Sequence, residues 1–408
     1  MFIMSKKESN NSLWERIRDF FIEYLSSLKN FFVKLFSKSE KKYSKNVETE
    51  EFVEETFDIC NHVVKNSLYG FVIGDAMGVP VEFIDRETLA KNPVISMRGY
   101  GTYNMPKGTW SDDTSMTLAT MDSIIRNNGD LNCYDVADRF CNWYNNAEYT
   151  ATNKVFDIGN QTKKALKAYQ EDTSNFRYKD LDVRGNGNGS LMRMLPVALY
   201  CHYKDLNNGE VLNVVSDLSA ITHPHEISIM GCYIYVKYIM FLLDGKDKLE
   251  AYNMLKGLDY NDFTKETTEV YSRILKQDIS KISLDEIKST GYIVHTLEAV
   301  MWLTLNCNNY NKSIITAVNL GEDTDTIAAI TGSITGMLYG FESIDKDWLK
   351  ALKNKKYLNK IIVDFEEKMK NININEIKRD NISDDIHREY VMDSKIQQNI
   401  NNGMSKNF

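Results

Sequence analysis

The chain has 408 residues, a formal net charge of -8 and a hydrophobic fraction of 43%. A chain of this length and hydrophobicity can bury a sizeable core, which excludes disorder of the whole. The negative charge disfavours broad nucleic-acid binding, because neutralising phosphates requires a basic face. Only five prolines are present, and the 21 glycines gather in particular stretches, so long helices joined by a few special loops are expected.

Residues 13–36 form the first predicted element, an amphipathic helix with apolar residues three and four positions apart. Charged side chains such as Glu15 and Arg18 interrupt it, so it is neither a transmembrane span nor a signal peptide. We expect it to dock on the chain's own body or on a partner, in a cytoplasmic protein. The alternative is a peripheral position on an acidic membrane surface. A polar linker over residues 41–51 completes an N-terminal part, residues 1–51.

Residues 52–370 show continuous helical periodicity and little period-two alternation, which predicts one all-α domain. The predicted helices cover residues 57–74, 114–126, 134–144, 161–169, 191–200, 210–222, 226–243, 247–256, 262–277, 294–306, 312–318, 325–338 and 348–370. Residues 371–408 are expected to form a polar tail. The six cysteines are scattered without C-x-x-C spacing, so we interpret them as buried free thiols.

Two acidic stretches stand directly before apolar helical runs: residues 111–114, S-D-D-T, and residues 319–326, N-L-G-E-D-T-D-T. Helix capping accounts for either stretch in isolation. Together they hold more carboxylates than two caps use, namely Asp112, Asp113, Asp323 and Asp325. If these converged, each pair near ~4 Å would repel by roughly 4 kcal/mol at an effective dielectric of about 20. Such a cluster requires cations, and carboxylates with hydroxyls suit Mg²⁺, Mn²⁺ or Ca²⁺.

A glycine-rich loop, residues 185–190, precedes the helix predicted over residues 191–200. The N-terminus of a helix is a ready anion or phosphate site, although an ordinary loop explains the sequence equally well. The loop does not fit the P-loop pattern or a dinucleotide fingerprint. The D-x-D spacing at Asp323 also suggests an aspartyl-phosphate phosphatase. We reject that alternative, because no apolar strand precedes the aspartate.

Six motifs follow one another in the order G-D-A-M-G-V-P-V-E-F, G-T-W-S-D-D-T-S-M, F-D-I-G, G-N-G-S-L-M-R, T-H-P-H and N-L-G-E-D-T-D-T-I-A-A-I-T-G. This set resembles the ADP-ribosylglycohydrolase family, whose members include the dinitrogenase-reductase-activating glycohydrolase and the J1 crystallins. The resemblance spans about residues 66–340. It implies an all-helical fold with two Mg²⁺ or Mn²⁺ ions in a cleft. It also implies release of ADP-ribose from a protein side chain or a small molecule.

The resemblance assigns residues position by position. The metal ligands it implies are Ser111, Asp112, Asp113, Asp323, Asp325 and Thr326, with Asp113 also in the catalytic set. The family more often has threonine at the first of these positions, and serine keeps the hydroxyl. The ADP-ribose contacts it implies are Gly187, Asn188, Gly189 and His223. Without the family, a loop histidine such as His223 is more often solvated.

Cleavage of a glycosidic bond normally requires a carboxyl acid/base, and the resemblance offers two. Glu82 matches the residue used by the branch that acts on ADP-ribosyl-serine, and Asp157 matches that of the arginine-directed branch. The intact F-D-I-G motif favours arginine. From the residues alone, Glu82 would be a surface carboxylate and Asp157 a helix N-cap. Two alternatives stay open: hydrolysis of another ADP-ribosyl linkage (serine, nucleobase or metabolite), and a non-catalytic, crystallin-like protein that binds ADP-ribose.

Overall fold

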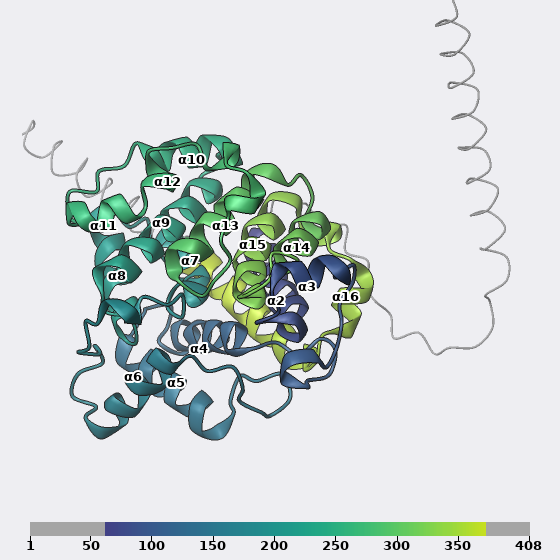
Figure 1. The fold of residues 1–408 in the computed structure, drawn as a ribbon. Coiled ribbons are helices and arrows are strands. Elements are labelled where there is room, and N and C mark those ends of the chain that lie inside the picture. Colours follow the sequence, from purple (N-terminus) through teal and green to yellow (C-terminus); the bar gives the residue numbers. More distant parts are fainter. Residues whose placement is uncertain (1–61, 373–408) are drawn as a thin grey trace, which may run out of the picture. The chain divides into compact units, whose positions relative to one another are not determined.

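The computed structural model describes residues 62–372, so the predictions for the N-terminal helix and the polar tail lie outside the described residues. Within this range the regular structure is helical, as Figure 1 shows, and β-pairing is limited to two isolated bridges, Tyr100 with Met105 and Gly187 with Tyr292. The prediction of an all-α domain is confirmed.

The helices succeed one another with short 3₁₀ turns between them. Their bounds are α2 Val63–Gly78, α3 Arg86–Lys91, α4 Asp112–Arg126, α5 Cys133–Asn146, α6 Asn160–Glu171, α7 Leu195–Tyr203, α8 Asn208–Ala220, α9 Glu226–Leu243, α10 Lys248–Lys256, α11 Lys265–Val270, α12 Ser272–Leu275, α13 Ile293–Asn306, α14 Tyr310–Val318, α15 Thr324–Tyr339 and α16 Lys346–Ala351. A last helix covers residues 355–372.

Three predicted helices differ from the structure. Residues 262–277 form two helices, α11 and α12, separated at Tyr271, whose buried hydroxyl donates to the Ile227 carbonyl over 2.7 Å. Residues 348–370 are divided after α16, where the Lys353 amide leaves the helix and donates to the Gly108 carbonyl over 2.9 Å. In both places a tertiary contact replaces a helical one. The short helix α3 was not predicted.

The third difference concerns the element after the glycine-rich loop. Its first residues form a 3₁₀ turn, Leu191–Arg193, and α7 begins only at Leu195. Pro196 is the second residue of α7, where its missing amide proton costs no helical hydrogen bond. The loop therefore does not run into the N-terminus of a long helix, and the phosphate argument based on a helix dipole is wrong at this position.

Helices α2 and α15 pack side by side in the middle of the domain (Figure 1). Glycines permit the close approach: a Cβ on Gly70 would lie 2.2 Å from the Gly332 carbonyl oxygen. At the other end of α2, a Cβ on Gly78 would lie 2.3 Å from the Cα of Asp325. The beginning of α15, with its aspartate, is thus held against the end of α2.

Helix α9 has the predicted bounds and is a core helix. By length and composition it could cross a membrane, but 83% of it is buried inside the domain, where it packs against α7, α8 and α10. The five described cysteines are free thiols, and all but the half-buried Cys133 are buried, as expected. The sixth, Cys60, lies outside the described residues.

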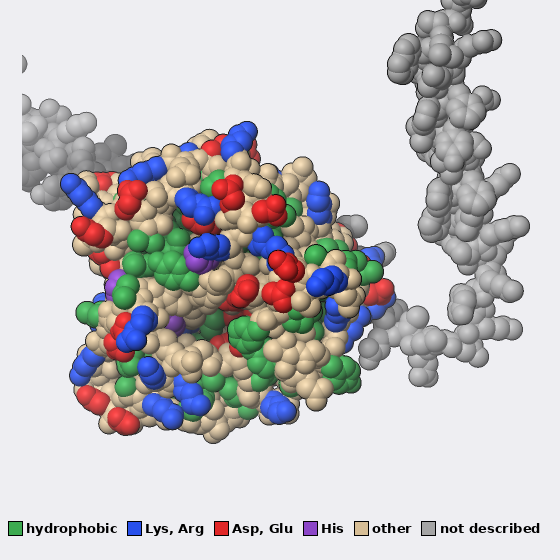
Figure 2. Space-filling model, viewed as in Figure 1, with side chains coloured by type: hydrophobic (Ala, Val, Ile, Leu, Met, Phe, Trp, Pro, Cys, Tyr) green, Lys and Arg blue, Asp and Glu red, His purple; other side chains and the backbone are tan. Residues whose placement is uncertain are grey.

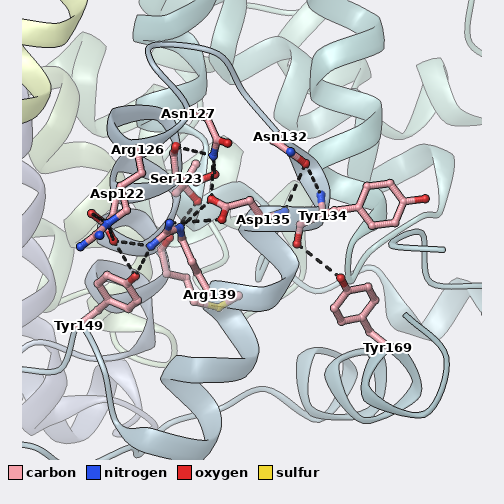
Figure 3. A network of polar contacts seen from close by, with 12 residues as sticks. Asp122, Ser123, Arg126, Asn127, Asn132, Tyr134, Asp135, Arg139, Tyr149 and Tyr169 are labelled. Carbon is pink, nitrogen blue, oxygen red and sulfur yellow. Dashed lines mark hydrogen bonds and ion pairs between the residues drawn. The ribbon is translucent and has the colours of Figure 1, made fainter. Parts of the chain in front are cut away.

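A polar network joins α4, α5 and the chain after α5 (Figure 3). The Arg139 guanidinium pairs with Asp122 of α4, bonds Asp135 of α5 over 2.7 Å and donates to the Tyr149 hydroxyl over 3.0 Å. The Tyr149 carbonyl also accepts from the Trp110 indole over 3.1 Å. Both ends of Tyr149 are therefore anchored, which fixes the start of the segment that leads to the F-D-I-G motif.

Candidate active site

Two turns from distant parts of the chain pair through their backbones. The Phe83 amide donates to the Glu322 carbonyl over 2.7 Å, and the Glu322 amide donates to the Ile84 carbonyl over 2.9 Å. Gly321 and Glu322 have φ angles of 76° and 63°, a left-handed conformation that turns the chain sharply before α15. This pairing places Glu82 beside the beginning of α15.

Three carboxylates converge there. Oxygens of Glu82, Asp157 and Asp325 all lie within 4.8 Å of one another. Glu82 is only 5% exposed, so it is not a surface carboxylate. Asp157 does not cap α6, whose N-cap is Gly159; its carboxylate instead accepts a hydrogen bond from the Tyr103 hydroxyl.

Asp113 extends this cluster from α4, since its Oδ1 lies 3.4 Å from the hydroxyl of Thr326 on α15. Ser111 caps α4, because its Oγ accepts from the Asp113 amide over 3.2 Å. Asp75, fully buried in α2, accepts from the Ser111 amide over 2.9 Å and from the Thr114 amide over 3.0 Å. Asp75 and Ser111 together satisfy the start of α4, which leaves the aspartates of its first turn available for another ligand.

Asp323 occupies the N-cap position of α15 but makes no capping hydrogen bond with its side chain. Its Oδ2 accepts instead from the side-chain amide of Asn188 over 2.7 Å, and the same side-chain amide donates to the Thr296 hydroxyl over 2.9 Å. Capping therefore does not explain this aspartate, and the glycine-rich loop and the acidic cluster are in direct contact.

Four buried carboxylates of this site each keep one oxygen without a hydrogen-bond partner among the described residues. These oxygens are Glu82 Oε2, Asp113 Oδ2, Asp323 Oδ1 and Asp325 Oδ2. Buried polar atoms are nearly always paired, and an unpaired buried charge is costly. A set of carboxylate and hydroxyl oxygens is what Mg²⁺ and Mn²⁺ bind, so the residues present fit divalent cations.

The protonation of the cluster shows the same crowding. Burial, reinforced by neighbouring carboxylates that include Glu82 for Asp112 and Asp325, raises the pKa of Asp112, Asp113 and Asp325 well above the usual range. Burial and then the charges of Asp157 and Asp323 raise the pKa of Glu82 to about 11. Without cations Glu82 therefore retains its proton at neutral pH, as a carboxyl buried beside other carboxyls does.

The glycine-rich loop is fixed on both sides. The backbone amide of Asn188 donates to the Gly291 carbonyl over 3.0 Å, and the buried Arg193 guanidinium donates to the Gly189 carbonyl over 3.0 Å. A Cβ on Gly189 would lie 2.9 Å from Cε1 of His223, so any other residue would displace the imidazole. His223 is 3% exposed, not solvated, and burial beside Arg193 lowers its pKa to about 3. The imidazole is therefore neutral at physiological pH.

A cleft of about 300 Å³ brings the two parts together. Figure 2 shows a hollow near the middle of the drawn face, with acidic side chains in and beside it. The predicted site residues that line the cleft are Glu82, Asp112, Asp113, Asp157, Gly187, Asn188, Gly189, His223, Asp323 and Thr326. Ser111 and Asp325, each 1% exposed, are buried next to this lining.

Known proteins are similar to this chain over most of its described length. The family model for ADP-ribosylglycohydrolases matches residues 61–373. An ADP-ribosylarginine hydrolase of Serratia proteamaculans is 31% identical over 71% of this chain and 74% of its own length. The chain belongs to the ADP-ribosylglycohydrolase family.

Other members of the family are also similar. An ADP-ribosylarginine hydrolase of Pseudomonas putida is 30% identical over 73% of this chain and 76% of its own length. The ADP-ribosyl-[dinitrogen reductase] glycohydrolase of Rhodospirillum rubrum is 28% identical over 69% and 87%. A solved structure described as an ADP-ribosylglycohydrolase-related protein complex has a TM-score of 0.64, covering 77% of this chain and 100% of that one at 25% identity.

Several residues of this ADP-ribosylglycohydrolase site were not singled out from the sequence. Asp75 lies inside the G-D-A-M-G motif, which could have indicated it. The Arg86 guanidinium supports the turn before α15, donating to the carbonyls of Leu320 and Ile287 over 2.9 and 2.7 Å. Tyr103, which holds Asp157, ends a short 3₁₀ turn, Gly101–Tyr103, whose sequence carries no recognisable signal.

Proposed function

We propose that this chain is a metal-dependent hydrolase that cleaves the bond between ADP-ribose and a modified arginine side chain. Membership of the family makes it a hydrolase of the ADP-ribosylglycohydrolase type. The choice of arginine is supported by the two similar ADP-ribosylarginine hydrolases and by the F-D-I-G motif, whose Asp157 lines the cleft. Its substrate is then an ADP-ribosylated protein.

The observation that carries the proposal is the convergence of buried carboxylates with unpaired oxygens at one end of the cleft. The residues that would hold two Mg²⁺ or Mn²⁺ ions are Ser111, Asp112, Asp113, Asp323, Asp325 and Thr326. Bound cations would supply Lewis-acid polarisation of ribose hydroxyls and of water. The carboxylates that hold them lie beside the acid/base residues Glu82 and Asp157.

At the other end, the glycine-rich loop binds the phosphates of ADP-ribose. Gly187 and Gly189 carry no side chains, so a phosphate can approach the backbone closely. The neutral imidazole of His223 adds a hydrogen-bonding group to the loop without adding charge. Its Nδ1 lies 2.6 Å from the Thr222 hydroxyl, which leaves Nε2 facing the loop glycines. Phosphate end and carboxylate end together orient the glycosidic bond.

Two carboxyl groups can move protons at the scissile bond. Asp157 is oriented by the Tyr103 hydroxyl, and Glu82, whose raised pKa keeps it protonated in the cation-free site, lies beside it. We assign the acid/base role to Asp157, with Glu82 as the second carboxyl. Asp157→Asn and Glu82→Gln separate the two, because the variant that loses the acid/base loses more of kcat than of substrate affinity.

The test is direct. Purified protein with Mg²⁺ and an ADP-ribosyl-arginine protein should release ADP-ribose, while Asp113→Asn and Asp325→Asn should abolish release. A panel of serine, nucleobase and metabolite linkages distinguishes the other hydrolase activities. Full activity in either aspartate variant would refute the two-metal assignment. ADP-ribose binding with no hydrolysis of any linkage would instead indicate a binding protein of the crystallin kind.

A further inference from the structure

Phe83 combines three unusual properties. It lines the cleft, 68% of its surface is exposed, and its φ angle is 62°. A left-handed conformation is uncommon for a bulky residue and costs on the order of 1–3 kcal/mol. The backbone hydrogen bond from its amide to the Glu322 carbonyl, 2.7 Å long, holds this conformation. The fold thus keeps a solvent-exposed phenyl ring at a fixed position despite strain and exposure, as happens at ligand sites.

The ring lies at the carboxylate end of the cleft. Its centroid is 6.4 Å from that of Tyr103, at 62°, and the Tyr103 hydroxyl donates to Asp157. The residue before it is Glu82, whose carbonyl accepts from the Thr102 hydroxyl over 2.7 Å. Phe83 therefore belongs with the acid/base carboxyls, whereas the glycine-rich loop contacts the cluster through Asp323.

The size of the cleft determines which part of the substrate passes this ring. A volume of about 300 Å³ admits parts of ADP-ribose and a side chain, but not the protein that carries them. The modified side chain must then reach the carboxylates from the solvent side, where the exposed ring of Phe83 stands.

We propose that the Phe83 ring stacks on the guanidinium group of ADP-ribosyl-arginine and so determines recognition of the acceptor side chain. This inference rests on the proposed function. A guanidinium is planar, charged and weakly hydrated, so it stacks well on an aromatic face. The neighbouring carboxyl group of Asp157 adds a hydrogen-bond acceptor for the guanidinium N–H groups. Phe83 is thus a specificity-determining residue, and proton transfer does not depend on it.

The experiment compares Phe83→Leu and Phe83→Trp with the control Tyr100→Leu. Leucine keeps apolar bulk without a π-face, and tryptophan keeps the face. Tyr100 is also an exposed aromatic residue, at 61%, with a φ of 66°, but it does not line the cleft. Kinetics on ADP-ribosyl-arginine, calorimetry with ADP-ribose and melting curves are recorded for each variant and for the wild type.

We expect Phe83→Leu to raise KM for ADP-ribosyl-arginine by about 3- to 30-fold with little change in kcat. ADP-ribose affinity and melting temperature should stay at the wild-type values. Phe83→Trp and Tyr100→Leu should resemble the wild type in KM. An unchanged KM in Phe83→Leu, or an equal loss of ADP-ribose affinity, overturns the inference while leaving the proposed function intact. A wild type that cleaves only linkages without a guanidinium overturns both.

Discussion

The side-chain amide of Asn188 donates to the carboxylate of Asp323 over 2.7 Å. This hydrogen bond links the glycine-rich loop to the beginning of α15, two segments that are far apart in the chain. The backbone of Asn188 is anchored as well, by the bond from its amide to the Gly291 carbonyl. These two bonds connect the proposed phosphate end of the cleft to the proposed metal end and so fix the position of one end relative to the other.

Asn188→Ala should lower kcat/KM about 10- to 100-fold, because residues that orient metal-binding carboxylates have effects of that size. It should also weaken binding of Mg²⁺, since Asp323 would lose the donor that orients it. Steady-state kinetics at several Mg²⁺ concentrations measure both. Asn127→Ala is the matched control: that amide bonds Asp135 over 2.9 Å in the network of Figure 3, away from the cleft. Equal activity of the two variants would contradict the role of Asn188.

Asp75→Asn should lower the free energy of unfolding by about 1–3 kcal/mol, because one carboxylate oxygen becomes an amide nitrogen that cannot accept, so a single oxygen remains for the bonds from Ser111 and Thr114. Activity should fall too, since these bonds position the first turn of α4. Urea unfolding and the specific activity of the folded protein measure the two effects. Asp364→Asn, on the surface beside Lys360, should change either by little. A fully stable Asp75→Asn would show that the bonds to α4 are dispensable.

Gly332→Ala should destabilise the domain by about 3 kcal/mol or more. A methyl group there would lie 2.2 Å from the Gly70 carbonyl oxygen and force α15 away from α2. Gly257→Ala provides the comparison, because its nearest neighbour would be 3.5 Å away and its φ is -91°. That variant should be within about 1 kcal/mol of the wild type. Thermal melting distinguishes them, and similar melting temperatures would contradict the close packing.

The stabilisation by Mg²⁺ should increase with pH. Burial raises the pKa of Asp323 to about 6 and that of Asp113 and Asp325 well above the usual range. When a carboxyl has a raised pKa in the folded state, its contribution to stability is fully present at pH values below its unfolded-state pKa of about 4. This contribution is lost as the pH rises through the folded-state pKa. Cations offset the resulting repulsion, and protons compete with them.

The melting temperature is measured with Mg²⁺ and with chelator at each pH. The difference between the two values removes the contribution of titratable groups that lie far from the cations. We expect a small difference near about pH 5 and a larger one near about pH 8. Asp325→Asn should lose most of the increase. A difference that is independent of pH would mean that the cluster does not bind the ion.

Much of the fold was predictable because helical periodicity is a local property. The predicted bounds of α9 agree with the structure, and the beginning of α4 was placed within two residues. Helices α11 and α12 were predicted as one, because the bond from the Tyr271 hydroxyl to Ile227 that accompanies the break is a tertiary contact. Because Tyr271 and Ile227 are 44 residues apart, a local sequence pattern does not reveal this bond.

The site was predictable in part. The acidic composition at Asp112 and Asp323 exceeded what capping requires, which is a local signal, and motif order supplied the rest. The burial of Glu82 could not be derived from the residues, because it depends on the pairing of Phe83 with Glu322, far away in the chain. Asp157 looked like an N-cap because the sequence does not show that its φ is 56° or that Gly159 is the N-cap of α6.

The most direct measurement of the central claim is a crystal structure of the protein with Mn²⁺ and ADP-ribose, using the anomalous signal of the metal. We expect two metal peaks within about 2.5 Å of carboxylate oxygens from Asp113, Asp323 and Asp325, with the ribose beside them and the phosphates on the glycine-rich loop. Peaks elsewhere, or ADP-ribose bound in this cleft with no metal next to these aspartates, would contradict it.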